Sequence, residues 1–169
     1  DMIPSLKKVE PTEGMTVVET MPQVQFVDSD KAGWYRITLD GECKVEAADE
    51  DGAYYAKVTL DNLKRNAGGN QLPNLVIEDW PDFGYRGFML DISRNFTTKD
   101  NILKFIDLLA HYKASVFHLH FGDDEGWRLE IEKFPELTSF GAYHAFPSKD
   151  ENGEYVETEG LIPSYNGGA

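Results

Sequence analysis

Two apolar runs separated by a helical pattern limit the possible folds of this chain more than any other feature. The runs span residues 87–92 and 116–121, and apolar side chains dominate both. Such runs are typical of strands that are covered on both faces. Between them, Ile102, Phe105 and Leu109 recur at helical spacing. The pattern predicts a strand–helix–strand unit with parallel strands and a right-handed connection.

The first half of the chain has the pattern of short strands followed by one helix. Residues 15–19, 23–27 and 34–39 combine β-branched and apolar side chains, and a return strand is expected after the tight-turn signal Asp40-Gly41. Next, Ala56, Leu60, Leu63 and Ala67 recur at helical spacing, and two glycines after Ala67 are expected to end this helix. These elements predict a small α+β domain.

Proline, glycine and acidic residues predict the domain boundary and the structure of the last part of the chain. A connector is indicated by Pro73, Pro81 and the acidic pair Glu78-Asp79 between them. The expected domains therefore cover residues 1–82 and residues 83–169. A short helix is predicted just before Pro135, over residues 130–134. The polar, glycine-rich stretch after Pro147 is expected to be mostly loop.

The charge of the chain excludes some classes of partner. Sixteen lysines and arginines against 30 aspartates and glutamates give a net charge of −14. Nucleic acids and anionic membrane surfaces require a basic face, so neither is expected as a partner. No apolar run is long enough to span a bilayer. The start at Asp1 without a signal core is typical of a mature or trimmed chain, and the single Cys43 leaves the compartment open.

Charged side chains follow both predicted strands, at the strand ends where parallel α/β folds bind ligands. Asp91 and Arg94 come after the first strand, and Asp123 and Asp124 come after the second. Arg94 is expected to point toward the same site at the strand ends as Asp123 and Asp124. A fixed guanidinium there offers several N–H donors in one plane to sugar hydroxyls or to an acid. The alternatives are a structural salt bridge for Arg94 and a helix cap or turn for Asp91.

Three other side chains near the second strand have both a functional and a structural interpretation. His118 and His120 are two residues apart, so both rings face one side of the strand and could hold a metal together with Asp123. Hydrogen bonds to carboxylates are the commoner use of such rings, and no metal is predicted. Trp127 either offers its ring to a sugar or covers the core. Adjacent carboxylates such as Asp123 and Asp124 rarely flank one glycosidic bond.

Several stretches together match the motifs of one enzyme family. Residues 86–96 read Arg-Gly-Phe-Met-Leu-Asp-Ile-Ser-Arg-Asn-Phe, and residues 118–128 read His-Leu-His-Phe-Gly-Asp-Asp-Glu-Gly-Trp-Arg. They resemble the first two barrel strands of family 20 glycoside hydrolases, the β-N-acetylhexosaminidases. The intervening helix with Lys113 also fits, and residues 52–63 resemble the helix of the small domain before that barrel. The resemblance covers about residues 34–142.

The resemblance implies a fold and a chemistry. The fold is α/β: a small α+β domain over residues 1–82, then the opening βαβ part of an incomplete (β/α)8 barrel over residues 83–169. The chemistry is substrate-assisted retaining hydrolysis of terminal N-acetylhexosamine, in which the sugar's acetamido oxygen replaces an enzyme nucleophile. Arg94 matches an arginine that grips sugar hydroxyls, and Asp123 matches a carboxylate that supports the pocket. Further pocket support is expected from Asp124, His120 and Trp127.

One part of the family pattern is missing from the sequence. The family's catalytic Asp-Glu pair follows the fourth barrel strand, and nothing after Gly141 offers that strand or that pair. A complete (β/α)8 barrel takes about 250 residues. The chain is therefore expected to be a portion of a larger enzyme, to hold no catalytic residue and to be inactive alone. Its expected partner is the remainder of the barrel, from the same gene or another chain, or a second copy of itself.

The expected ligands are glycans that contain N-acetylhexosamine, and no cofactor is expected. The resemblance favours a secreted or periplasmic protein. Two alternatives stay open: a non-catalytic carbohydrate-binding fragment, and a metal-dependent hydrolase that uses His118 and His120.

Overall fold

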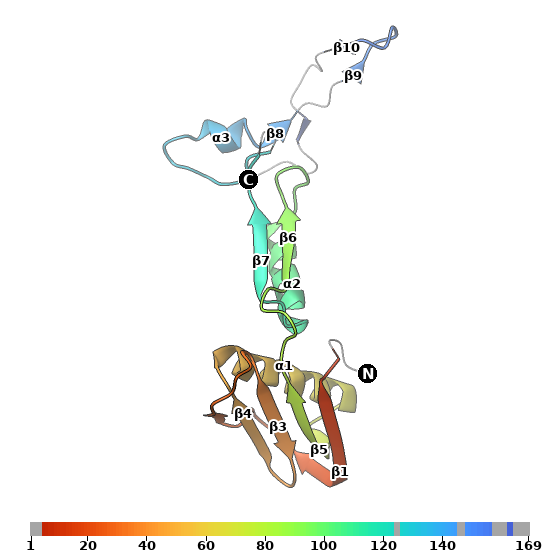
Figure 1. Cartoon of the computed structure of the whole chain (residues 1–169). Helices are drawn as coiled ribbons and strands as arrows, with labels where there is room; N and C mark the ends of the chain where they lie inside the picture. The colour runs from red at the N-terminus through yellow and green to blue at the C-terminus, as the bar shows by residue number, and fades with distance from the viewer. Residues whose placement is uncertain (1–4, 124–125, 145–147, 157–161, 164–169) are drawn as a thin grey trace. The chain divides into compact units, whose positions relative to one another are not determined.

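The computed structural model describes residues 5–123, 126–144, 148–156 and 162–163 (Figure 1). The chain forms two compact units. The first unit comprises Asp1–Arg86 and Ala110–Ser115, and the second unit comprises Gly87–Leu109 and Val116–Ala169. No helix in the described part of the chain is both long and apolar enough to cross a membrane.

The first unit is a five-stranded sheet with a helix on one face (Figure 1). Its strands are β1 (Lys8–Val17), β2 (Val24–Phe26), β3 (Tyr35–Leu39), β4 (Cys43–Ala47) and β5 (Gln71–Asp79). They lie in the order β1-β5-β3-β4-β2, and every neighbouring pair is antiparallel except β2 with β4. The helix α1 (Glu50–Ala67) packs on β3, β4 and β5. This arrangement agrees with the α+β pattern of the sequence.

Local sequence explains why these elements form. In β3, Tyr35, Ile37 and Leu39 alternate with more exposed residues and are buried, as the period-two pattern predicts. Asp49 caps α1 by accepting a hydrogen bond from an N–H of the first turn, at 2.8 Å. Gly68 ends the helix in the left-handed conformation, with φ of 71°. The core between helix and sheet includes Val45, Ala47, Tyr55, Ala56, Leu60, Leu72, Leu75 and Ile77.

The predicted connector around Pro73 is wrong, because this stretch is strand β5. It lies inside the sheet between β1 and β3. Proline is tolerated there for two reasons: β3 pairs only with the part of β5 from Leu75 onward, and the register of β1 shifts between Pro11 and Met15, opposite Pro73. The acidic pair Glu78-Asp79 ends this strand and does not belong to a linker.

The second unit contains the predicted strand–helix–strand arrangement. Strands β6 (Gly87–Asp91) and β7 (Val116–His120) form a parallel pair, in which Asp91 lies opposite His120. Helix α2 (Lys99–His111) lies between them in the chain, and its last two residues cluster with the first unit. The parallel pairing predicted from the two apolar runs is therefore confirmed.

The strands of the second unit are not covered on both faces, contrary to the prediction. Phe105 of α2 packs on the rings of Phe88 and Phe117, with ring centres 4.8 and 5.8 Å apart. On the opposite face Met89 remains 53% exposed, and α2 itself has no buried residue. The reason is that this sheet has only two strands within the described residues.

The last part of the second unit also differs from the predictions. Pro135 begins a helix, α3 (Glu136–Ser139), instead of stopping one over residues 130–134. Pro135 is the N-cap residue of α3, and its φ of −61° is compatible with the start of a helix. The stretch after Pro147, expected to be mostly loop, contains three two-residue strands among its described residues: β9 (Ser148–Lys149), β10 (Tyr155–Val156) and β11 (Ile162–Pro163). β10 pairs antiparallel with β9, and β11 pairs antiparallel with β8 (Tyr143–His144), which precedes this stretch.

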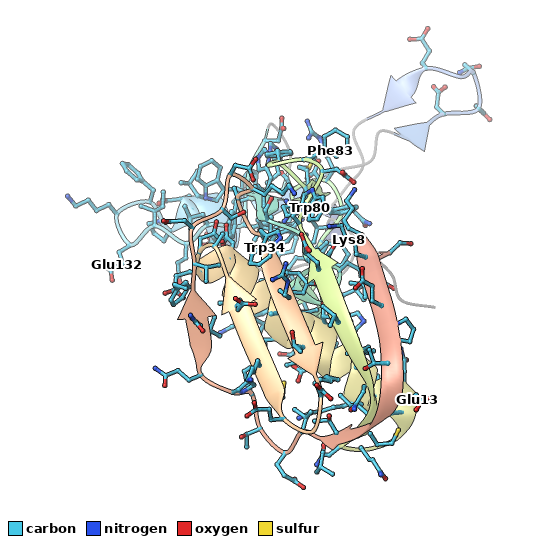
Figure 2. The ribbon with its side chains drawn as sticks, turned by 60° about the horizontal axis from the view of Figure 1, so that its bottom comes forward. Lys8, Glu13, Trp34, Trp80, Phe83 and Glu132 are labelled. Atoms are coloured by element: carbon cyan, nitrogen blue, oxygen red, sulfur yellow. The ribbon has the colours of Figure 1, made fainter. Side chains whose placement is uncertain are left out.

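The sheet face opposite α1 carries paired charges. Glu78 accepts a hydrogen bond from the indole of Trp34 at 3.1 Å, and forms salt bridges of 3.3 Å with both Lys8 and Arg36. The hydrogen bond from the Trp34 indole lowers the pKa of Glu78 most, and those from Arg36 and Lys8 add to it. Together they outweigh desolvation, which raises this pKa. Figure 2 shows Lys8 and Trp34 toward the same end of the sheet. The face is a solvated surface whose charges neutralise one another.

Candidate functional site

The carboxyl ends of β6 and β7 bring four polar residues together. The register places Asp91 opposite His120, and the turns that follow carry Arg94 and Asp123. The Arg94 guanidinium contacts both aspartates: Nη1 lies 2.8 Å from Oδ2 of Asp91, and Nη2 lies 2.7 Å from Oδ2 of Asp123. We call Asp91, Arg94, His120 and Asp123 the strand-end cluster.

Asp91 holds both the turn after β6 and the arginine that the turn carries. Its Oδ1 accepts hydrogen bonds from the backbone N–H groups of Ser93, at 2.9 Å, and Arg94, at 3.1 Å. Desolvation raises the pKa of Asp91, but the hydrogen bonds from the Arg94 guanidinium and these N–H groups outweigh it and leave the pKa lowered. The turn role expected for Asp91 and its ion pair with Arg94 therefore occur together.

The cluster presents a restrained cation to solvent. The Arg94 side chain is 50% exposed, although carboxylates hold its guanidinium from two sides. A guanidinium carries five N–H donors in a planar fork, so it can recognise neighbouring hydroxyls or a carboxylate with defined geometry. The arrangement suits recognition of a polar ligand at the strand ends.

His120 joins the cluster through Asp123, because its Nε2 lies 2.8 Å from Oδ2 of that aspartate. His118 lies two residues earlier on β7 and is exposed. Among the described residues, no three His, Cys, Asp or Glu side chains gather to hold a metal ion. His120 thus makes a hydrogen bond to a carboxylate, the commoner use of such a ring.

Asp124 and Trp127 are the other two predicted pocket residues. Asp124 lies outside the described residues. Trp127 packs on its own loop: the indole N–H donates to the carbonyl of Leu129, and a Cβ added at Gly122 would lie 2.7 Å from the ring. These contacts hold the ring against its own loop, and the proposed pocket role of Trp127 stays a prediction.

Sequence reasoning missed Arg128, a buried arginine behind the cluster. Its Nε donates to the carbonyl of Ile92 at 2.8 Å, Nη2 donates to that of Ser93 at 3.0 Å, and Nη1 donates to that of Ala142 at 2.7 Å. The side chain also lies over the ring of Phe96, 5.1 Å from its centre. No local pattern points to these contacts, because the acceptors are backbone carbonyls of distant segments.

The first unit contains a separate buried polar cluster around Lys113. The Lys113 ammonium lies 3.0 Å from Oδ2 of Asp79 and 2.8 Å from the hydroxyl of Tyr35, which contacts the Thr59 hydroxyl at 2.6 Å. Burial lowers the pKa of Lys113, and the nearby Asp79 only partly offsets this effect. A cavity of about 170 Å³ beside this cluster is lined by residues that include Lys7, Tyr55, Trp80, Phe83, Arg86 and Tyr112.

Comparison with known families matches almost the whole described chain. Residues 4–80 match the family described as glycosyl hydrolase family 20, domain 2. Residues 83–162 match glycosyl hydrolase family 20, catalytic domain. The second match contains the whole strand-end cluster, and the first contains the sheet and helix of the first unit.

Individual relatives and solved structures agree with these matches. The N,N'-diacetylchitobiase of Vibrio harveyi is 43% identical over 123 residues, which cover 72% of this chain and 14% of that protein. A beta-hexosaminidase of Porphyromonas gingivalis is 48% identical over 99 residues, covering 54% of this chain and 13% of that protein. The chain therefore spans about a seventh of the length of these relatives.

Among solved structures, a crystal structure of a beta-N-acetylhexosaminidase superposes with a TM-score of 0.71 and 29% identity over 92% of this chain and 34% of that one. A family 20 exo beta-N-acetylglucosaminidase from Vibrio harveyi, in complex with N-acetylglucosamine, gives a TM-score of 0.71 and 28% identity over 84% and 28% of the two chains. The mixed α/β fold with a small N-terminal domain is thus shared with these enzymes.

Proposed function

Because this chain belongs to glycosyl hydrolase family 20, we propose that it is a sugar-gripping portion of a β-N-acetylhexosaminidase, which removes terminal N-acetylhexosamine from glycans. One observation carries the proposal: at the ends of two parallel strands, Arg94 is exposed to solvent but held between Asp91 and Asp123. The names of the relatives fit this activity, and one similar structure holds N-acetylglucosamine.

We propose roles for the cluster that follow from its chemistry. The Arg94 guanidinium donates hydrogen bonds to hydroxyls of the terminal sugar. Asp91 and Asp123 hold it in place, so little side-chain freedom is lost when the sugar binds. Asp123 also orients His120 beside the guanidinium. None of these roles transfers a proton to the reacting bond, so the cluster binds and positions the substrate.

The bond-breaking chemistry is proposed to involve residues outside this chain. In substrate-assisted retaining hydrolysis, the acetamido oxygen of the sugar attacks the anomeric carbon while a carboxylic acid protonates the leaving oxygen. We propose that this acid and its neighbouring aspartate belong to later barrel strands. The chain alone is then a carbohydrate-binding fragment without hydrolytic activity.

The architecture proposed is a small domain over residues 1–82 and the first βαβ part of a (β/α)8 barrel over residues 83–169. The exposed apolar side chains of the second unit support it, since barrel strands are normally covered by neighbouring strands and helices. Met89 and Leu103 are each about half exposed. The proposed partner is the remainder of the barrel, supplied by the same gene or by another chain.

The test compares sugar binding with hydrolysis in the purified chain. The chain is expected to bind N-acetylglucosamine in calorimetry and to release no nitrophenol from nitrophenyl N-acetylglucosaminide. Arg94→Ala is expected to weaken binding by about 10- to 100-fold, because it removes charge-assisted hydrogen bonds. Arg65→Ala, at an exposed arginine near the end of α1, is the matched control. Nitrophenol release by the chain, or equal affinity of the Arg94→Ala variant, would contradict the proposal.

A further inference from the structure

The backbone that carries Arg94 is held from behind by a second, buried arginine. Arg94 follows Ile92 and Ser93, whose carbonyls both accept hydrogen bonds from Arg128, at 2.8 and 3.0 Å. Arg128 is only 7% exposed, whereas the Arg94 side chain is 50% exposed. Arg94 thus faces solvent at the strand ends, and Arg128 is buried beneath the turn that carries Arg94.

Arg128 also ties this turn to the segment around Ala142, and Ser93 ties it to the loop that carries Arg128. Its Nη1 donates to the carbonyl of Ala142, which is completely buried, at 2.7 Å. The Ser93 hydroxyl donates to the carbonyl of Gly126 at 3.2 Å. The turn, the loop after β7 and the segment around Ala142 therefore meet at one planar guanidinium, whose geometry fixes the direction of its three hydrogen bonds.

Gly126 allows the close approach that this arrangement needs. A Cβ at this position would lie 2.1 Å from the carbonyl oxygen of Ser93 and 2.8 Å from Nη2 of Arg128. The residue also has φ of 64°, in the left-handed region that favours glycine. The loop after β7 is therefore built to press on the Ser93 backbone, one residue before Arg94.

We propose that Arg128 is a positioning residue for the sugar site: by fixing the carbonyls of Ile92 and Ser93, it sets the place from which Arg94 reaches Asp123. Arg128 itself does not contact the sugar. The consequence for sugar binding rests on the proposed function, whereas the ordering of Arg94 does not. Loss of the Arg128 guanidinium removes the hydrogen bonds to the carbonyls of Ile92 and Ser93, and the Arg94 guanidinium then moves away from Asp123.

The experiment reads the Arg94 side chain directly. In ¹⁵N-labelled chain, the Nε–Hε signal of Arg94 is followed by NMR in the wild type and in Arg128→Lys, which keeps the charge but loses the planar fork. The Arg94 signal is expected to broaden or to move toward the position of a free arginine, while the amide spectrum stays dispersed. Arg65→Lys, at an exposed site, is the matched control and is expected to leave the Arg94 signal unchanged.

Sugar binding provides the second readout. Arg128→Lys is expected to weaken binding of N-acetylglucosamine about tenfold. In an Arg94→Ala background it should cause no further loss, because Arg128 acts through Arg94. If the wild type binds no sugar while the Arg94 signal still responds to Arg128→Lys, the proposed function fails and the positioning role stands.

A milder variant keeps the proposal falsifiable if Arg128→Lys does not fold. Phe96→Leu leaves Arg128 in place but removes the ring beneath its guanidinium. A smaller change of the Arg94 signal in the same direction is expected. An unchanged Arg94 signal in a folded Arg128→Lys chain, or in Phe96→Leu if the lysine variant is unfolded, would overturn the positioning role.

Discussion

Lys113 and Asp79 form an ion pair from which water is nearly excluded, with side chains 8% and 9% exposed. Removal of the lysine would leave a buried carboxylate without its cation, which usually costs about 3 to 5 kcal/mol. We therefore expect Lys113→Met to lower the free energy of unfolding by that amount in urea titrations. The effect of the left-handed backbone at this position, with φ of 57°, is similar for both side chains.

The matched control for that substitution is Lys57→Met. Lys57 forms an i,i+4 pair with Asp61 at 2.8 Å, but both side chains are at least half exposed. Exposed helix pairs contribute about 0.5 kcal/mol or less. Equal losses of stability in the two variants would contradict the view that Lys113 is a structural cation of the first unit.

Tyr35 makes the stability of the first unit sensitive to alkaline pH. Burial raises its pKa far above the ordinary value, and the negative charge of Asp79 adds to the effect. The unfolded chain releases this phenolic proton near pH 10, whereas the folded chain keeps it, so stability is full below about pH 10 and falls above it.

Tyr35→Phe removes that pH-dependent contribution. The variant is expected to be less stable than the wild type at pH 8, because it loses hydrogen bonds with Asp79 and Thr59. The difference in unfolding free energy should shrink between about pH 9 and pH 11, by about 1.4 kcal/mol per pH unit at most. Ile37→Val, a buried change without a titratable group, should keep a constant difference. A constant difference for Tyr35→Phe would contradict the assignment.

Residues that follow neighbouring strands could be predicted from the sequence, and residues that bind distant backbone could not. The sequence predicts Arg94 and Asp123 at one site because parallel strands end at the same sheet edge. The Arg128 acceptors Ile92 and Ala142 lie 36 and 14 positions away in the chain, and no periodicity connects them. The partners of Lys113 are also remote in the chain, and only the family resemblance distinguishes this lysine in the sequence.

At the scale of elements, α1 depends on a glycine within its first turn. A Cβ at Gly52 would lie 2.3 Å from the carbonyl oxygen of Trp34, which is rigid backbone. Alanine normally stabilises a helix over glycine by about 1 kcal/mol. Here we expect Gly52→Ala to destabilise the chain by about 1 to 3 kcal/mol, because the helix must move away from β3.

Thermal and urea unfolding measure this effect, with Gly69→Ala as control. An added Cβ at Gly69 meets no atom within 4 Å. That variant is expected to stay within about 0.5 kcal/mol of the wild type. A gain in stability for Gly52→Ala would show that helix propensity outweighs the close approach.

Element prediction succeeded where the pattern was periodic and failed where proline changed its meaning. The alternation in β3 and the helical stripe of α1 identified both elements. In β5, the sequence predicts a break at Pro73, but Pro73 lies where β1 is irregular and β3 has ended. The sequence predicts a helix stop at Pro135, whereas this proline is the N-cap residue of α3. Only tertiary pairing distinguishes these cases.

At the scale of the whole molecule, the two units differ in how well they bury apolar surface. Ile37, Leu72 and Ile77 of the first unit are fully buried, whereas α2 of the second unit has no buried residue. Local opening should therefore cost less free energy in the second unit. Amide hydrogen exchange is expected to be slow in β3 and β5 and at least about tenfold faster in β6 and β7. Equal protection would mean that the second unit is stable without further cover.

The central claim is that the strand-end cluster binds a sugar through Arg94. A titration of the ¹⁵N-labelled chain with N-acetylglucosamine, followed at every backbone amide, tests it most directly. We predict shifts confined to the segments around Asp91–Arg94 and His120–Asp123, no shifts in α1 or the five-stranded sheet, and no response in Arg94→Ala. Unchanged spectra, or shifts that persist in Arg94→Ala, would contradict the account.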